Sequence, residues 1–174
     1  MKHGIVKLKE LEINLEELAE FIVKAKKKCY AGNGKKSVLP DGSKLLTFQE
    51  GNFHYIDNYS GFYQAPGSEV VRWQKSDGQK IWQMSYSGGM KYKFWNDEKL
   101  AKKTFKFLKE ALLQVTPEKP FRGPLYFCNQ DFIYKNSSKG DVTRFRGTEE
   151  IKDGDFKPRV VFLQDYIGGL VVPK

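Results

Sequence analysis

The sequence repeats itself, and this repeat limits the possible folds more than any other feature. Motifs of residues 14–89 return in the same order in residues 96–169, at offsets of 79 to 82 positions. The recurring positions are Asn14/Asn96, Leu46/Leu125, Phe48/Phe127, Phe53/Phe132, Tyr55/Tyr134, Gly61/Gly140, Gly67/Gly147, Glu69/Glu149, Trp82/Phe162, Tyr86/Tyr166, Gly88/Gly168 and Gly89/Gly169. A preserved order with little drift in spacing predicts an internal duplication, with one copy at about 14–89 and the other at about 96–169.

Each copy begins with an amphipathic helix. Residues 14–29 place apolar side chains on one stripe at helical spacing, with Glu and Lys on the opposite side. Asn14 is suited to cap this helix, because its side chain can accept hydrogen bonds from the first free backbone N–H groups. A second helix is predicted at about 97–115, with Asn96 as its cap.

Four strand-like runs follow each helix. In the first copy they cover about 44–49, 52–58, 68–75 and 79–87; in the second, about 124–128, 131–136, 142–151 and 158–167. The connections are too short for parallel crossovers, so neighbouring strands should be antiparallel. The sequence therefore predicts a single α+β domain, built from an α-β-β-β-β unit used twice, with two helices, about eight antiparallel strands and pseudo-two-fold symmetry.

The composition indicates a soluble domain with a self-sufficient core. The 174 residues include 13 Phe, 9 Tyr and 3 Trp, and no segment approaches the roughly 20 apolar residues of a membrane span. The first ten residues lack the apolar stretch of a secretory signal, and Cys29 and Cys128 are expected to be reduced thiols. We therefore expect a cytoplasmic protein that does not enter a membrane; the sequence does not indicate an oligomeric state.

The net charge of +9 raises the question of nucleic-acid binding. Only five of the 30 basic residues are arginines, the residue type best suited to phosphate and base recognition. The lysines are scattered over both helices and most loops, which is typical of a solvated surface. Nucleic-acid binding is therefore possible but is the less favoured interpretation.

Several runs resemble a family of uncharacterised microbial domains. They are Tyr55–Gly61, Gly67–Val71, Ile81–Gly89, Phe121–Pro124 and Tyr166–Val171. The resemblance covers nearly the whole chain. Some members of that family are fused behind a helix-turn-helix DNA-binding domain, and this placement implies a sensor module. The resemblance implies no catalytic residues.

Glu69 and Glu149 form the most informative polar pair, because both copies keep a carboxylate just inside a strand. If a two-fold axis relates them, they could share one cavity, and proximity would raise the pKa of one of them as acid–base sites require. Alternatively, each glutamate accepts hydrogen bonds from the glycine-rich turn of its own copy and anchors a strand. The second interpretation is favoured, since no His or Lys adjoins either carboxylate in the sequence.

The duplicated aromatic residues suit either a ligand pocket or a core. We expect a small aromatic or amphipathic ligand to bind between the two copies, lined by the residues Tyr55, Trp82, Tyr86, Tyr134, Phe162 and Tyr166 and oriented by Glu69 or Glu149. No metal or cofactor is predicted, because His, Cys and Asp do not cluster at ligand spacing. Residues 31–37 are predicted to be a flexible connector or lid.

Three functions therefore remain open. The first is a non-enzymatic domain that binds or senses a small ligand, and it is favoured over catalysis. The second is a lysine-rich protein associated with nucleic acid. The third is a hydrolase-like enzyme that uses the paired glutamates across an open cleft.

Overall fold

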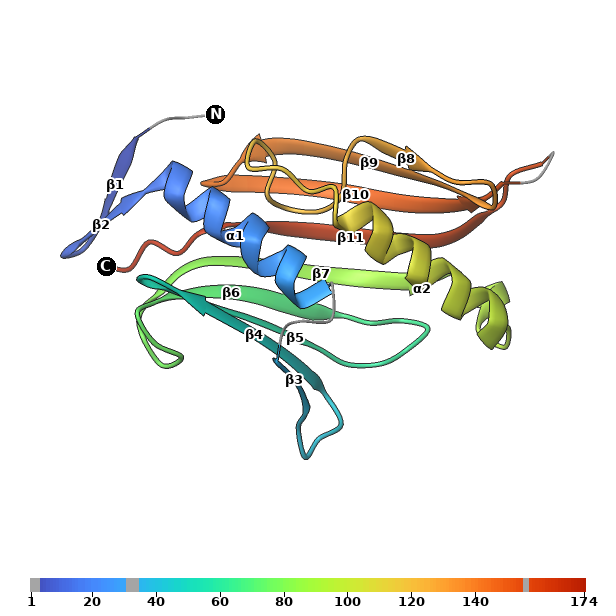
Figure 1. Cartoon of the computed structure of the whole chain (residues 1–174), viewed down its shortest axis with the longest axis horizontal. Coiled ribbons are helices and arrows are strands. Elements are labelled where there is room, and N and C mark those ends of the chain that lie inside the picture. Colours follow the sequence, from blue (N-terminus) through green and yellow to red (C-terminus); the bar gives the residue numbers. More distant parts are fainter. Residues whose placement is uncertain (1–3, 31–34, 155–156) are drawn as a thin grey trace.

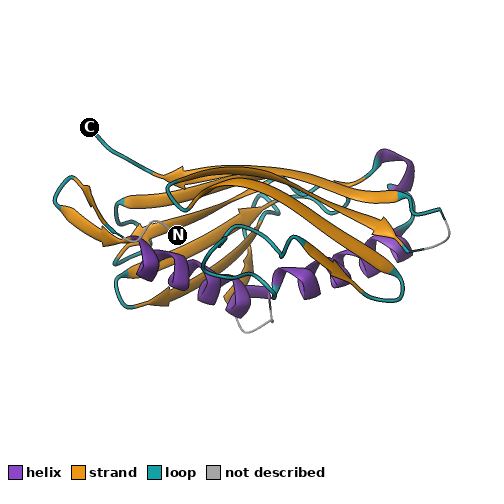
Figure 2. Cartoon of the chain, turned by 90° about the horizontal axis from the view of Figure 1, so that it is seen from above, coloured by secondary structure: helices purple, strands orange, loops and turns teal. Residues whose placement is uncertain are grey.

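The chain forms a long antiparallel sheet with two helices on one face (Figure 1). The computed structural model describes residues 4–30, 35–154 and 157–174. The sheet has nine strands in the order β3-β4-β5-β6-β7-β11-β10-β9-β8, and a separate hairpin joins β1 to β2. Figure 2 shows that the sheet is curved and that both helices lie on its concave side. The predicted α+β class and the antiparallel pairing are confirmed.

The strands are longest at the centre of the sheet and shortest at its two edges. The hairpin consists of β1 (Ile5–Leu8) and β2 (Leu11–Asn14). The sheet consists of β3 (Lys35–Val38), β4 (Lys44–Glu50), β5 (Phe53–Tyr59), β6 (Gly67–Trp73), β7 (Lys80–Met90), β8 (Tyr126–Cys128), β9 (Phe132–Asp141), β10 (Arg144–Asp153) and β11 (Val160–Leu170).

The two central strands, β7 and β11, pair with each other and join the two halves of the sheet. Tyr86 lies opposite Tyr166 in this pair. Trp82 pairs with Leu170, and Met90 pairs with Phe162. Phe162 lies 80 residues after Trp82, and Leu170 lies 80 residues after Met90, so the two pairs occupy equivalent positions in the sequence repeat. This is the register expected around a local two-fold axis between the two tyrosines. The duplication itself stays a prediction, and the strand order agrees with it.

The helices are α1 (Leu15–Tyr30) and α2 (Glu98–Leu112). The Oδ1 atom of Asn14 accepts hydrogen bonds from the backbone N–H groups of Glu16 at 2.9 Å and Glu17 at 3.3 Å, so the predicted cap is confirmed. The predicted cap of the second helix is wrong by one residue: Asp97 is the cap, and its Oδ1 accepts from the backbone of Leu100 at 2.9 Å. Asn and Asp cap equally well, so sequence alone did not distinguish the neighbours.

Replacing Asp97 with Ala should therefore lower the free energy of unfolding by about 1 kcal/mol, because the backbone N–H of Leu100 loses its acceptor. The matched substitution Asn96→Ala should change it by less than about 0.5 kcal/mol. Urea titrations of the two variants measure the difference. Equal losses would contradict the assignment of the cap.

Three strands were missing from the sequence prediction. Residues 5–14 form the β1–β2 hairpin, and Lys35–Val38 forms β3 at one edge of the sheet. Residues 31–34 of the predicted connector or lid lie outside the described residues, while its last residues belong to β3. These strands have only four residues each, too few for a two-residue alternation to stand out from chance.

The core lies between the helices and the concave face of the sheet. One cluster packs α1 against β4–β7 and includes Ile22, Tyr55 and Trp82. A second packs α2 against β9–β11 and includes Phe107 and Phe162. Among the described residues, no helix combines the length and the apolar character needed to cross a membrane.

Candidate functional site

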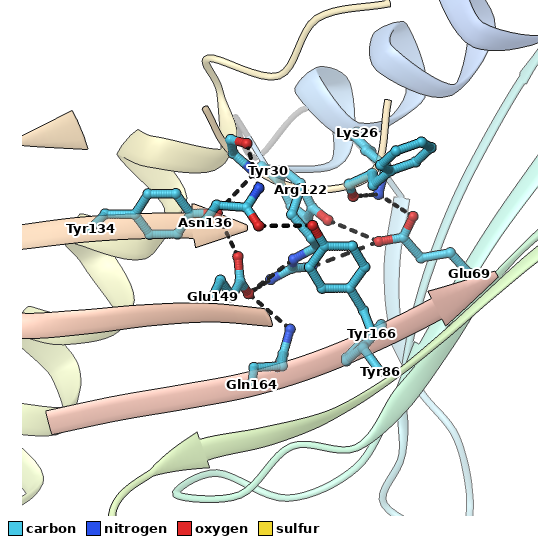
Figure 3. A network of polar contacts seen from close by, with 12 residues as sticks. Lys26, Tyr30, Glu69, Tyr86, Arg122, Tyr134, Asn136, Glu149, Gln164 and Tyr166 are labelled. Atoms are coloured by element: carbon cyan, nitrogen blue, oxygen red, sulfur yellow. Dashed lines mark hydrogen bonds and ion pairs between the residues drawn. The ribbon is translucent and has the colours of Figure 1, made fainter. Parts of the chain in front are cut away.

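The helix-facing side of the central strands holds a cluster of buried charges (Figure 3). None of its five charged residues is more than 5% exposed: Lys26, Asp57, Glu69, Arg122 and Glu149. Burial of a charge is costly unless the charge is paired and hydrogen-bonded, so each group needs a partner. We refer to these five residues as the charge cluster.

Glu69, on β6, is held by α1. The ammonium group of Lys26 forms an ion pair with its Oε2 atom, and the Tyr30 hydroxyl donates to its Oε1 atom at 3.2 Å. Lys26 also donates to the backbone carbonyl of Phe121 at 2.7 Å. Burial lowers the pKa of Lys26, and the attraction of Glu69 opposes this shift.

Glu149, on β10, is surrounded by donors. Its Oε1 atom accepts from Arg122 Nε at 3.0 Å, Arg122 Nη2 at 2.7 Å and Gln164 Nε2 at 2.9 Å. Its Oε2 atom accepts from the Tyr134 hydroxyl at 2.7 Å. Arg122 Nη1 also lies 3.8 Å from Glu69 Oε1, so this one guanidinium bridges the two glutamates.

The sequence interpretation of the glutamates is therefore corrected in two respects. Among the described residues, the side chains that bind both carboxylates come from other elements rather than from the glycine-rich turns. Basic residues do adjoin both carboxylates, but Lys26 comes from α1 and Arg122 from the segment between α2 and β8. Neither contact was predictable from the sequence, because the partners lie far apart along the chain.

The two central tyrosines make matching hydrogen bonds. Tyr86 donates to Asp57 Oδ1 and Tyr166 donates to Asn136 Oδ1, both at 2.7 Å. Asp57 and Asn136 are 79 residues apart, the offset of the repeat in this region. The two halves therefore use the same contact, with a carboxylate in one half and an amide in the other.

Small residues make room for these hydroxyls. Gly147 lies opposite Tyr166 in the sheet, and a Cβ atom placed on this glycine would come within 2.3 Å of the tyrosine oxygen. Gly67 lies opposite Tyr86, with a corresponding distance of 2.5 Å. The recurrence of these glycines in the sequence is thus explained by close approach of a side chain, a reason that glycine commonly serves.

Asp57 is the member of the charge cluster whose charge is least compensated. Burial, followed by repulsion from Glu69, raises its pKa from 3.8 to about 7, against the effects of the Tyr86 hydrogen bond, Lys26 and Arg122. Asp57 and Glu69 lie directly opposite each other on β5 and β6. Within the described part of the chain, Asp57 has no salt-bridge partner. This carboxyl can therefore change its charge near neutral pH.

A cavity of about 460 Å³ adjoins the charge cluster, between the helices and the sheet. Its apolar wall includes Leu46, Tyr59, Phe62, Phe105, Leu108 and Phe162. Four largely buried polar side chains line it: Asp57, Tyr86, Arg122 and Gln164. The C-terminal ends of α1 and α2 meet beside it, contributing Cys29 and Tyr30 from α1 and Lys109 and Leu112 from α2 (Figure 1).

The structure distributes the eight predicted site residues over three places. Tyr86 and Phe162 line the cavity. Glu69, Tyr134, Glu149 and Tyr166 belong to the hydrogen-bonded network beside it. Tyr55 and Trp82 are fully buried in the core, where the Trp82 indole donates to the carbonyl of Val142 at 3.1 Å.

No cluster of three or more His, Cys, Asp or Glu side chains suitable for a metal ion occurs among the described residues. Cys29 lies at the cavity, and burial raises the pKa of its thiol to about 12. This pKa works against thiolate chemistry at neutral pH. The polar groups at the cavity are thus suited to hydrogen bonding and charge pairing.

Comparison with protein-family models identifies the family of this chain. The family model of a domain of unknown function (DUF5680) matches residues 57–171, which is more than half of the sequence. The chain belongs to this family. The DUF5680 match begins at Asp57 and includes Glu69, Arg122 and Glu149, while α1 with Lys26 and Tyr30 lies before it. The searches of curated proteins and of solved structures each found no match.

Three residues of the charge cluster in this DUF5680 chain were not predicted from the sequence: Lys26, Asp57 and Arg122. A signal existed for Lys26, which is three residues before Cys29 and four after Ile22, and therefore shares their apolar stripe. A signal also existed for Asp57, because Asn136 follows it at the 79-residue offset of the neighbouring sequence motifs. Arg122 lies in an irregular segment, where no periodicity indicates burial.

Proposed function

We propose that this domain binds a small amphipathic molecule in the cavity between its helices and its sheet. The observation that carries the proposal is the combination of a 460 Å³ cavity, a mostly apolar wall and four converging polar side chains. Cavities of this size and composition are typical of small-molecule sites, in which apolar contacts give affinity and a few polar groups fix orientation.

The shape of the wall favours a flat apolar body. Phe62, Phe105 and Phe162 form a chain of edge-to-face contacts, with ring centroids 5.5 Å apart in the first pair and 6.3 Å apart in the second. Rings held edge to face leave flat surfaces free for further stacking. Phe62 is 39% exposed, so part of this wall is in contact with solvent.

The position of the cavity also supports a sensing role. Side chains from both helices and from both central strands line it. A ligand that contacts all these elements stabilises one arrangement of them over others, in proportion to its difference in affinity. Such coupling is what a sensor requires.

The hydrolase alternative has less support. Glu69 and Glu149 are fully buried, do not line the cavity and are already paired with cations. A general acid or base must lie within reach of its substrate. The nucleic-acid alternative stays a prediction that salt-dependent gel-shift titrations can test.

Filling the cavity should prevent binding. Cys29→Phe places a ring at the cavity, while the matched variant Cys128→Phe places one on the exposed strand β8. We expect the neutral probe 2-naphthylmethanol to shift the amide resonances of Gly88, Gly89 and Gln164 saturably in the parent protein and in Cys128→Phe. The same probe should not shift these amide resonances in Cys29→Phe.

A second pair of variants covers the case in which Cys29→Phe fails to fold. Lys109→Trp alters the exposed helical side of the cavity, and Lys106→Trp is its control on the same helix. Loss of binding is expected only in the first. Unchanged binding in both cavity variants, each shown to be folded by its thermal unfolding curve, would refute the proposal.

A further inference from the structure

We infer that the cavity selects organic cations: molecules with an apolar, preferably aromatic, body and a protonated amine that pairs with the carboxylate of Asp57. This inference rests on the proposed function and names the chemical class of its ligand. Four independent observations carry it, concerning the balance of charges, the matching half of the sheet, the helix ends and the aromatic wall.

The first observation is the balance of charges. The charge cluster contains three carboxylates and only two cations. Lys26 pairs with Glu69, and Arg122 pairs with Glu149 and approaches Glu69. Asp57 is left over, and it is the carboxylate that lines the cavity. A buried carboxylate without a cation is neutralised by a proton or by a cationic ligand.

The second observation is that the structure does not require a carboxylate at this place. In the second half of the sheet, Asn136 accepts the equivalent hydrogen bond from Tyr166 at the same 2.7 Å distance. An amide is therefore sufficient to accept the hydrogen bond from the central tyrosine. The extra negative charge of Asp57 must be explained by something else, and the cavity beside it provides the explanation.

The third observation is the direction of the helices. Both α1 and α2 end at the cavity with their C-termini (Figure 1). The C-terminal end of a helix carries a partial negative charge, because its last carbonyl groups are not paired within the helix. Two such ends at one cavity favour a positive group and disfavour an anion.

The fourth observation is that rings of the wall already bind cations of the protein. The Arg122 guanidinium lies over the Tyr86 ring at 5.5 Å, and the Lys44 ammonium lies over the Tyr59 ring at 5.2 Å. Aromatic faces attract cations through their quadrupole. The phenylalanine rings of the same wall can attract the positive group of a ligand in the same way.

An anionic ligand would meet competition. Arg122 and Lys26, the buried cations, are engaged by Glu149 and Glu69, so an anion would have to displace a carboxylate. Lys44 and Lys109 line the cavity from its solvent side, where water and salt weaken their effect. Lys44 is in addition held by the carbonyl of Gly61 at 3.2 Å.

The affinity for an amine should depend on pH through Asp57. The groups that face it are Lys26, Cys29 and Tyr30 from α1, Glu69 from β6 and Tyr86 from β7, together with Arg122. Tyr59 on β5, Lys44 on β4 and Lys109 on α2 line the same cavity. Burial raises the pKa of Cys29, Tyr30 and Tyr86 to well above neutrality, so they keep their protons near pH 7. Ionisation of Asp57 above pH 7 therefore strengthens amine binding.

Three probes with the same ring test the inference: 2-naphthylmethylamine, 2-naphthylmethanol and 2-naphthoic acid. We expect the amine to bind about tenfold more tightly than the alcohol at pH 8, the size of effect typical of one charge-assisted hydrogen bond. The acid should bind most weakly. The preference for the amine should shrink as the pH falls to 6, while the affinity for the alcohol stays constant.

Two variants assign the effect to one carboxyl. Asp57→Asn should remove the preference for the amine, since the amide still accepts from Tyr86 but carries no charge. Asp77→Asn, at an exposed position, should keep the preference. Equal affinity for amine and alcohol, or tighter binding of the acid, would overturn the cation inference and leave the proposed function standing. Failure of all three probes to bind would overturn both.

Discussion

Replacing Arg122 with Met should lower the free energy of unfolding by about 3–5 kcal/mol. The substitution keeps most of the side-chain volume but leaves Glu149 and Glu69, both fully buried, without their shared cation. Removing one partner of a buried ion pair leaves an uncompensated charge in a medium of low dielectric constant, and this cost is larger than that of most point mutations. Urea unfolding followed by tryptophan fluorescence measures it.

The matched control is Lys102→Met on α2. Lys102 pairs with Glu98 one helical turn away, with both side chains more than 60% exposed. Exposed pairs of this kind contribute about 0.3–0.5 kcal/mol. The double variant Arg122→Met/Glu149→Gln should recover part of the loss, because it removes the orphaned charge. A loss below about 1 kcal/mol in Arg122→Met would mean that the charge cluster is hydrated in solution.

Asp57→Asn should make the protein more stable above pH 7, by about 2–4 kcal/mol relative to the parent. Its pKa is about 7 in the folded protein and has its ordinary value of 3.8 when the carboxyl is freely solvated. At a pH between these two pKa values, Asp57 has released its proton in the unfolded chain but keeps it in the folded protein. The parent therefore loses stability as the pH rises from about 4 to about 7, and above pH 7 the loss is complete.

The amide removes this titration without removing the hydrogen bond from Tyr86, as the contact between Tyr166 and Asn136 illustrates. The measurement is the difference in unfolding free energy between parent and variant at a series of pH values, in which other titrating groups largely cancel. A difference that stays constant from pH 4 to pH 8 would contradict the raised pKa. A variant that is more stable but no longer prefers the amine over the alcohol would show that Asp57 lowers stability while it provides ligand selectivity.

The sequence predicted what depends on local pattern. Helical spacing located both helices, and Asn14 was recognised as a cap because capping requires only residues close in sequence. The short turns predicted the antiparallel pairing, and the repeat singled out Tyr86, Tyr166, Glu69 and Glu149, all of which lie at the central strands or next to them.

The environment of these residues was not predictable in the same way. Alternation along a strand shows that Trp82 and Tyr86 face the same side of the sheet, but not that Trp82 packs in the core while Tyr86 borders a cavity. That difference depends on where the two helices end above the sheet. The partners of the glutamates also come from elsewhere, since Lys26 lies 43 residues before Glu69. Such contacts are set by tertiary packing.

The two outermost strands of the sheet have a consequence for how copies of this chain meet. β3 has four residues and β8 has three, so each of these two strands offers only a short row of backbone donors and acceptors to another molecule. The two longest strands, β7 and β11, lie at the centre of the sheet, whereas β9 lies next to β8 and pairs with it only at residues 133–135. Extension of the sheet along β3 or β8 into the next molecule would gain few hydrogen bonds, and short edge strands of this kind are a recognised protection against fibrous aggregation.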